Sequence, residues 1–267
     1  MIKPMPINQI HLSAAIITLN EEQNIGDCIK SLDWVDEIVV VDSLSTDNTK
    51  KVAKSLGAKV IDQAFLGHVK QKQLAVDSCS HDWIICLDAD ERITADLKKE
   101  IIQLFTNTPV DGLSDGYTVA RKSFHLGKWI MHGGWYPDRN IRLFNRKHGR
   151  WTGLNPHDVI EVRGKPGRLE GALQHFVFED LAHNIRTNNS YSSISAKILF
   201  ESGKKPSLPK LLFKPLGKFI ETYFLKRGFL DGLPGFIISI GAAYSMFLKH
   251  AKHWEYYHIK KNGSHTK

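Results

Sequence analysis

The feature that most constrains the fold is an alternation of short apolar runs with helical patterns along the first part of the chain. The runs, rich in Val, Ile and Leu, occupy residues 14–18, 38–42, 58–62 and 83–88. The helical patterns fall at about residues 21–33, 47–56, 68–79 and 94–106. Strands that alternate with helices predict a parallel sheet, and runs without polar alternation indicate a sheet covered on both faces. We therefore expect an α/β fold whose ligands bind at the carboxyl edge of the sheet.

Length and cysteine content narrow the class of protein. A chain of 267 residues with 42% hydrophobic residues can bury a full core, as one large domain or as a domain with an appendage. Its three cysteines form no Cys-x-x-Cys pair, so we expect neither a disulfide framework nor a cysteine zinc site. The first residues lack the basic start, apolar stretch and cleavage site of a secretory signal. These features favour a location in the cytoplasm.

Positive charge is concentrated in the last third of the chain. The whole sequence has a formal net charge of +8 and a pI of about 9.3. Residues 180–267 contain 14 Lys and Arg against 5 Asp and Glu, a net charge of +9, which leaves 22 against 23, or −1, for residues 1–179. The basic residues alternate with aliphatic stripes and form no known nucleic-acid-reading motif. We expect no nucleic-acid partner and favour an anionic membrane surface.

The same region is strongly apolar. One helical stripe is expected to hold Leu212, Leu216, Phe219, Ile220 and Tyr223, opposite Lys210, Lys214 and Lys218, with Pro215 near the start of the helix and Lys210 outside it. The uncharged run from residue 232 to 248 is slightly short of the roughly 20 residues that span a bilayer. We therefore expect helices that lie in the membrane interface. The alternative is packing against the first domain or against a second copy of the chain, as a homo-oligomer.

Polar residues cluster where the expected strands end. They lie at residues 18–22, 42–47 and 88–91. Asn20 could cap the following helix, and Thr46 or Asp47 could cap the next one. Asp42 ends an apolar strand, where its carboxylate suits the N–H of a base or a ribose hydroxyl.

Asp88 and Asp90 are the strongest candidate site residues. A spacing of two on an extended backbone sends both side chains to one face. Two like carboxylates beside a buried strand are unfavourable unless a cation joins them. Oxygen ligands suit Mg²⁺ or Mn²⁺, which usually also takes phosphate oxygens of a substrate. The pair therefore predicts a metal-bound diphosphate, with a solvated acidic turn as the alternative.

These motifs together resemble the family 2 glycosyltransferases, inverting enzymes of the GT-A fold that use nucleotide-activated sugars. The resemblance rests on TLNEE at residues 18–22, VVVDSLSTDNT at 39–49, QKQ at 71–73 and LDADE at 87–91. It implies a Rossmann-like, mostly parallel central sheet with flanking helices at residues 10–179. Residues 180–267 would form a basic, amphipathic helical region that associates with membrane.

Further segments are similar to the subgroup that adds glucose or related sugars to the lipopolysaccharide inner core. They are FHLGKWIMHGGWYPDRNIRLFNRKHGRW at 124–151, PHD at 156–158, LEGALQH at 169–175, GFLDGLPG at 228–235 and FLKHAKHWE at 247–255. The likeness thus covers about residues 12–256. It implies a nucleotide-diphosphate sugar as donor, with UDP-sugar as the first choice, and a cell-envelope glycan or glycolipid as acceptor, at the inner face of the cytoplasmic membrane.

The resemblance also implies roles for individual residues. The nucleotide-sugar site would contain Thr18, Asn20, Glu21, Asp42, Ser43, Lys72, Asp88, Ala89 and Asp90. The divalent ion would be held by Asp88 and Asp90, with His175 as a further ligand or else a structural histidine. Gln73 departs from the asparagine that is more common in the family.

Inverting transfer is a single displacement, which needs a general base for the acceptor hydroxyl and stabilisation of the departing diphosphate. The metal would provide the stabilisation. We expect Asp158 to be the base, although the subgroup generally has His-Glu where this chain has His157-Asp158. Glu161 and Asp180 are the alternatives. The acceptor site would contain Trp135, Arg139, Arg142 and His157, for which packing or surface ion pairs are the alternative uses.

Other acceptors and other classes of protein stay open at this point. A polyprenyl-phosphate-linked or capsule and exopolysaccharide acceptor fits the same motifs. A nucleotidyltransferase would also use a parallel sheet and metal-binding carboxylates, although TLNEEQN lacks the glycine-rich basic loop expected there. A non-catalytic membrane-bound scaffold is the third possibility.

Overall fold

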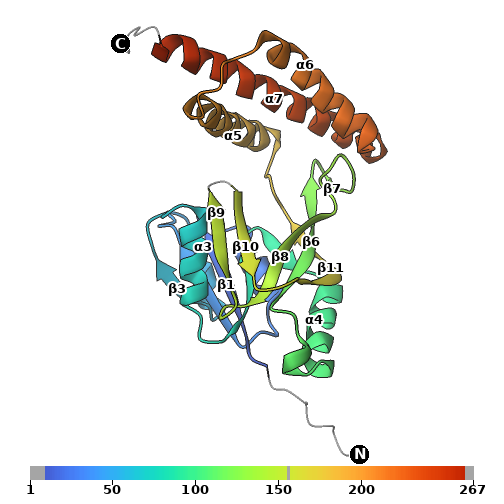
Figure 1. Cartoon of the computed structure of the whole chain (residues 1–267). Helices are drawn as coiled ribbons and strands as arrows, with labels where there is room; N and C mark the ends of the chain where they lie inside the picture. Colours follow the sequence, from blue (N-terminus) through green and yellow to red (C-terminus); the bar gives the residue numbers. More distant parts are fainter. Residues whose placement is uncertain (1–9, 155–156, 262–267) are drawn as a thin grey trace, which may run out of the picture. The chain divides into compact units, whose positions relative to one another are not determined.

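The computed structural model describes residues 10–154 and 157–261 and divides the chain into two compact units (Figure 1). The first unit contains Met1–Lys122 and Asp138–His175, and the second contains Ser123–Pro137 and Phe176–Lys267. The segment 123–137 therefore packs with the C-terminal part of the chain. The domain boundary expected after residue 179 stays a prediction, because a packing unit need not fold alone.

Four parallel strands form the first half of the sheet, in the order β3-β2-β1-β4. They are β1 (Leu12–Thr18), β2 (Glu37–Asp42), β3 (Lys59–Asp62) and β4 (Trp83–Asp88). The helices between and after them are α1 (Ile25–Lys30), α2 (Thr49–Ser55), α3 (His68–Asp77) and α4 (Ala95–Asn107). The alternation predicted from the sequence is confirmed.

The rest of the sheet is largely antiparallel, so the nine-stranded sheet is mixed. Beyond β4 the order is β8 (Asp138–Asn145), β6 (Gly116–His125), β11 (Gly167–His175) and β5 (Glu91–Ile93), and β7 (Lys128–Ile130) pairs with the end of β6. A short 3-10 turn, η1 (Val110–Gly112), precedes β6. A separate hairpin consists of β9 (Gly149–Leu154) and β10 (His157–Val162).

Both faces of the parallel strands are buried, which explains their continuous apolar sequences. Ala14 and Ile16 of β1 pack into one hydrophobic cluster with residues of α1 and α4. Ala15, between them, packs into a second cluster with residues of α3 and β9. Side chains that alternate along a strand thus meet apolar neighbours on either side.

Helix α1 begins later than the sequence suggests because side chains hold the preceding loop in another conformation. Asn20 adopts a left-handed backbone with φ of 53°. Its Oδ1 accepts a hydrogen bond from Thr46 N at 2.9 Å, and Glu21 N donates to Thr49 Oγ1 at 2.8 Å. Asn20 therefore ties two loops together and does not cap α1. Asp47 accepts from Thr49 N at 3.0 Å, at the start of α2.

The second unit is mainly helical. Its elements are α5 (Leu181–Glu201), α6 (Leu208–Phe219), the π-helical turn η2 (Ile220–Leu225), the 3-10 turn η3 (Gly228–Asp231) and α7 (Gly232–Lys261). The expectation that α6 starts near Pro215 is wrong: Pro215 lies inside the helix, and Pro209 occupies its first turn. Lys210 consequently belongs to α6.

Buried Asp231 attaches the segment 123–137 to these helices. Its carboxylate accepts hydrogen bonds from Met131 N at 3.1 Å and His132 N at 2.8 Å. It also lies 3.2 Å from His132 Nδ1. Gly228 and Gly235 allow the close chain packing around it, since a Cβ on Gly235 would lie 1.9 Å from Gly228 O.

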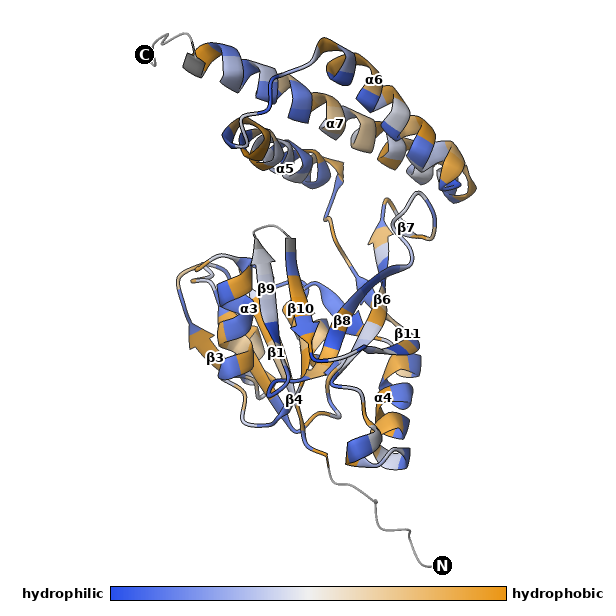
Figure 2. Ribbon diagram, viewed as in Figure 1, coloured by the Kyte–Doolittle hydropathy of each residue, from blue (hydrophilic) through white to orange (hydrophobic). Residues whose placement is uncertain are grey.

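The helical stretch Gly228–Ile259 is long and apolar enough to cross a membrane, judged by length and composition alone. Its mean hydropathy in the most apolar window is 1.3, and 22% of that window is buried. Apolar and basic residues alternate along α6 (Figure 2). Several large apolar side chains of this unit are strongly exposed: Leu208, Leu212, Phe213, Leu216, Leu225, Leu230 and Leu233.

Candidate active site

A lysine joins two of the predicted site carboxylates in the first unit. Asp88 ends β4, Lys72 lies on α3, and Asp158 lies on β10. Lys72 Nζ is 2.8 Å from Asp158 Oδ2 and 3.1 Å from Asp88 Oδ1. The same amine lies 4.7 Å from the centroid of the Trp151 ring, a cation–π contact. The fold thus brings together a strand end, a helix and a hairpin that are far apart in sequence.

The charges in this cluster stabilise one another. Burial raises the pKa of Asp88, but Lys72 and Arg142 outweigh burial and hold that pKa well below its usual value. Burial lowers the pKa of Lys72, and the negative charges of Asp88 and Asp158 outweigh it, so that the lysine pKa is raised. Asp88 is therefore a carboxylate at neutral pH and Lys72 an ammonium.

Glu91, the last residue of the LDADE motif, joins this cluster in a role that the sequence did not predict. It is fully buried, accepts a hydrogen bond from Asp88 N at 2.9 Å, and pairs with Arg142 Nη2 at 2.7 Å. Arg142 Nη2 also lies 3.9 Å from Asp88 Oδ2. The ion pair fixes the backbone and the charge at the end of β4. Only the position of Glu91 directly after the Asp88-Ala89-Asp90 run could have indicated it.

The second aspartate pairs with the predicted histidine. Asp90 Oδ2 lies 3.1 Å from His175 Nε2, on β11. In the described part of the chain, six buried side-chain polar atoms have no hydrogen-bond partner, and those of this region include Thr18 Oγ1, Asp90 Oδ1 and Arg142 Nη1. Asp88 Oδ1 is also among the six, but it is ion-paired with Lys72 Nζ at 3.1 Å. Buried carboxylate oxygens without a hydrogen bond are unfavourable unless a ligand meets them. Two carboxylates and an imidazole fit a divalent cation of the Mg²⁺ or Mn²⁺ class.

Most of the predicted nucleotide residues line the loops after β1 and β2. Asp42 is fully buried, and its two oxygens accept hydrogen bonds from Ser45 N at 2.7 Å and Ser45 Oγ at 2.6 Å. Ser43 N donates to the Thr18 carbonyl at 2.8 Å, which links the ends of β1 and β2. Ala89 is buried beside Asp88. The direct contact of Asp42 with a base stays a prediction.

The predicted acceptor residues are distributed over both units. Arg142 is buried and forms an ion pair with Glu91. Arg139 donates a hydrogen bond to the Leu169 carbonyl at 2.7 Å. Trp135 lies in the second unit, stacked on His125 with ring centroids 5.9 Å apart. The side chain of His157 lies outside the described residues. The acceptor roles of all four stay predictions.

The two alternative bases lie in different surroundings from Asp158. Glu161 occupies the same strand, β10, opposite Arg150. Asp180 caps α5 in the second unit by accepting a hydrogen bond from His183 N at 2.6 Å. Of the three carboxylates, Asp158 is the one that shares Lys72 with Asp88.

Comparison with known proteins shows the family to which the chain belongs. Residues 13–162 match the family model described as glycosyl transferase family 2. A lipopolysaccharide core biosynthesis glycosyltransferase, LpsC, of Rhizobium meliloti is 34% identical over 95% of this chain and 96% of its own length. An uncharacterised glycosyltransferase of Rickettsia typhi is 34% identical over 90% of this chain and 86% of its own.

A solved structure, glucosyl-3-phosphoglycerate synthase from Mycobacterium tuberculosis with Mg²⁺ and UDP, is 26% identical to this chain. Its TM-score is 0.33, and the match covers 43% of this chain and 44% of that one. The family match takes in the strand ends that carry Asp88 and Asp158, and the two curated relatives are similar along nearly the whole chain. The chain therefore belongs to glycosyl transferase family 2.

Proposed function

We propose that the protein is an inverting, divalent-metal-dependent hexosyltransferase that moves a sugar from a UDP-sugar to the lipopolysaccharide core or a related cell-envelope glycolipid. The observation that carries the proposal is the cluster at the end of β4, in which half-buried Asp90 has an oxygen without a hydrogen-bond partner and Asp88 shares Lys72 with Asp158. The name of the Rhizobium meliloti relative supports the choice of acceptor. Family membership favours sugar transfer over nucleotidyl transfer and over a non-catalytic scaffold.

Asp88, Asp90 and His175 would hold the metal ion. When bound, the ion neutralises the charge that develops on the leaving diphosphate, as a Lewis acid. Lys72 and Arg142 keep Asp88 charged, and Glu91 fixes the chain that carries it. The loops tied together by Asn20 and Asp42 give the nucleotide a pre-formed surface at the carboxyl edge of the sheet.

Lys72 links donor binding to the candidate base. In the absence of donor its amine is shared by Asp88 and Asp158, and a carboxylate paired with an ammonium is a weak proton acceptor. A diphosphate beside Asp88 offers Lys72 further negative charge. When the Lys72 amine shifts toward the diphosphate, its ion pair with Asp158 is lost. Asp158 Oδ2 can then take the proton of the acceptor hydroxyl.

The second unit supports a peripheral position on the inner face of the cytoplasmic membrane. Its exposed apolar side chains on α6, η2 and the start of α7 stand beside Lys210, Lys214 and Lys218. Apolar groups that enter the headgroup region and lysines that meet anionic lipid are the two contributions a monotopic anchor needs. Helix α7 packs against both α5 and α6, and Lys252 Nζ bonds to Asn189 Oδ1 at 2.7 Å. This polar contact between α5 and α7 favours a helix α7 that lies in the membrane interface over one that crosses the bilayer.

The test of the transferase proposal is ligand-dependent thermal stability of the full chain. UDP with Mn²⁺ should raise the melting temperature more than either component alone, because ligands that bind the native state stabilise it by mass action. GDP and dTDP serve as comparisons. Absence of a shift with every nucleotide diphosphate contradicts the proposal. Hydrolysis of UDP-, GDP- and dTDP-sugars then identifies the donor, and transfer to core, polyprenyl-linked or capsular acceptors identifies the acceptor.

A further inference from the structure

Three side chains meet at the amino edge of the parallel sheet, away from the residues of the candidate active site. His11 precedes β1, Asp36 precedes β2, and His81 lies just before β4. These strands are neighbours in the order β2-β1-β4 and run parallel. Parallel strands start at one edge, so the three residues are brought to one place by the same topology that gathers Asp42 and Asp88 at the other edge.

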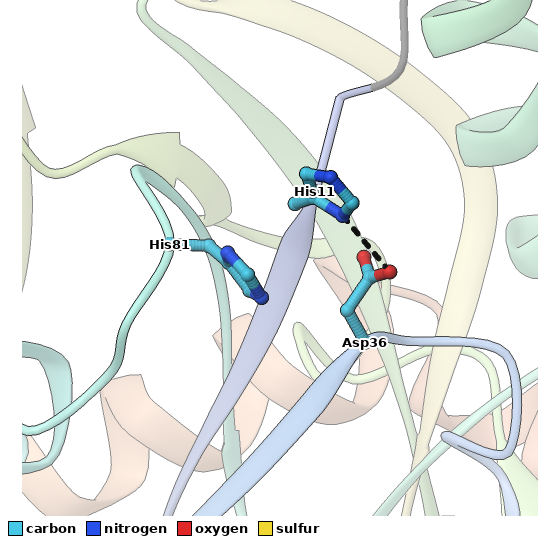
Figure 3. A group of neighbouring side chains, drawn as sticks. All are labelled: His11, Asp36 and His81. Atoms are coloured by element: carbon cyan, nitrogen blue, oxygen red, sulfur yellow. Dashed lines mark hydrogen bonds and ion pairs between the residues drawn. The ribbon is translucent and has the colours of Figure 1, made fainter.

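The three side chains face one another (Figure 3). His11 Nδ1 lies 3.1 Å from Asp36 Oδ1, and the two imidazole rings are stacked with centroids 5.0 Å apart. One nitrogen from each histidine and one oxygen of Asp36 all lie within 4.8 Å of one another. We propose that His11, Asp36 and His81 form a binding site for a transition-metal cation of the Zn²⁺ class, distinct from the proposed diphosphate-binding metal site.

The ligand set distinguishes the two sites chemically. Two imidazoles and one carboxylate are a donor set typical of Zn²⁺, with water in the fourth position, whereas Mg²⁺ prefers oxygen ligands.

The three ligand atoms need to approach one another only slightly to reach the distances found around a bound zinc ion. Tetrahedral zinc ligands bonded at about 2.0–2.1 Å lie roughly 3.4 Å from one another. The His11 side chain is half exposed and bonds to Asp36, so the closure requires a change in its orientation, while hydrogen bonds hold the backbone beside the site. Leu12 N donates to Asp36 Oδ2 at 2.8 Å, and His81 N donates to Ser13 Oγ at 3.3 Å. Bound metal would tie the starts of three adjacent strands together.

The experiment is a Zn²⁺ titration of the full, untagged chain, read by calorimetry and by the melting temperature, with Co²⁺ as a spectroscopic probe. We expect tight binding in the wild type and in Asp90→Ala, and a melting temperature raised by about 5 °C at a hundredfold excess over Kd. His11→Ala and His81→Ala should each weaken binding by about tenfold or more and abolish the visible absorption of tetrahedral Co²⁺.

His148 provides the matched control. It is a partly exposed histidine that also pairs with an aspartate, Asp115, at a place where no second histidine completes a three-ligand group in the described chain. His148→Ala should bind Zn²⁺ as the wild type does. Circular dichroism of His81→Gln in EDTA shows whether this variant is folded without metal. It therefore distinguishes loss of a zinc ligand from loss of the fold. Unchanged zinc affinity in both His11→Ala and His81→Ala, or loss of zinc binding in Asp90→Ala, overturns the proposal. Either result leaves the transferase test unaffected.

Discussion

At the residue scale, the chemistry depends on a few carboxylates whose surroundings give them different tasks. Asp88 ends the buried strand β4 and pairs with Lys72, whereas Asp90 keeps one oxygen without a hydrogen bond. Asp42 has both oxygens occupied by Ser45, so it stabilises its loop whether or not a nucleotide is present. Residues of one type at equivalent strand ends are thus distinguished by hydrogen bonding.

Two substitutions should separate binding from turnover. Asp90→Ala removes a proposed metal ligand, so metal-dependent stabilisation by UDP should be lost. Asp158→Asn keeps the size of the side chain but removes the proton acceptor, so nucleotide binding should persist while kcat falls by roughly 10²–10⁴. Thermal shift and a transfer assay measure the two effects.

Asp33→Asn is the control for both variants, because Asp33 is an exposed aspartate that pairs only with Lys98 among the described ion pairs. It should leave nucleotide binding and kcat unchanged. Full activity of Asp158→Asn moves the base to Glu161 or Asp180, and UDP-dependent stabilisation of Asp90→Ala contradicts the metal assignment.

At the element scale, side chains at the strand starts hold neighbouring elements together. Glu37, the first residue of β2, accepts hydrogen bonds from Ser13 Oγ at 2.6 Å, on β1, and from Ser80 N at 2.6 Å, in the loop before β4. Partial burial raises the pKa of Glu37, but these hydrogen bonds outweigh it and lower the pKa below the usual value.

This lowered pKa predicts how stability depends on pH. A carboxyl group with a lower pKa in the folded state adds stability above its unfolded pKa of about 4.3, and that stability is lost as the pH falls through the folded value. Glu37→Gln should therefore lower the free energy of unfolding by about 1–2 kcal/mol at pH 7 and by less at pH 3. Urea unfolding at both values measures the difference; an equal loss at both would contradict the assignment.

The attachment of residues 123–137 to the helices gives a second prediction at this scale. Asp231→Ala leaves the partly buried N–H groups of Met131 and His132 without their acceptor. An unsatisfied buried group costs about 1–3 kcal/mol, so the second unit should unfold more easily. Hydrogen exchange of 123–137 and 228–235 should accelerate while exchange in β1 and β4 stays unchanged. Asp111→Ala, on the η1 turn, is the control.

At the scale of the whole molecule, the two units have different surfaces. The first unit buries most of its apolar residues between the sheet and the helices that cover it, whereas the second exposes many of them beside basic residues. Replacing Phe213, Leu225 and Leu233 by serine should shift the protein from vesicles with anionic lipid to the soluble fraction. Removal of the chain after about residue 205 should do the same.

The matched control replaces three exposed apolar residues of the first unit, Phe65, Leu66 and Val110, by serine. This variant should sediment with vesicles as the wild type does. Binding to phosphatidylglycerol vesicles that exceeds binding to phosphatidylcholine vesicles supports the role of the lysines. Unchanged sedimentation of the triple variant in the second unit indicates that its apolar surface packs against protein, such as a second copy of the chain.

Much of this molecule was predictable from local sequence. Strands β1 to β4 and the helices between them follow from apolar runs and helical periodicity, because a segment buried on both faces must be apolar throughout. The run from Asp88 to Asp90 predicts a metal site, because a cation stabilises two neighbouring carboxylates, and this site stays a prediction. The motifs also gave the family, which the family match confirmed.

Other features were decided by contacts between residues far apart in the chain. Lys72 and Asp158 are 86 positions apart, and no pattern in either segment predicts that one amine serves Asp88 and Asp158 together. The late start of α1 depends on a loop held by residues 45–49, and the meeting of His11, Asp36 and His81 depends on strand order. The sequence by itself determined which segments are strands and which residue types could do the chemistry, because burial and periodicity are local properties. Only the tertiary structure decided which charges are partners, because pairing depends on distance in space.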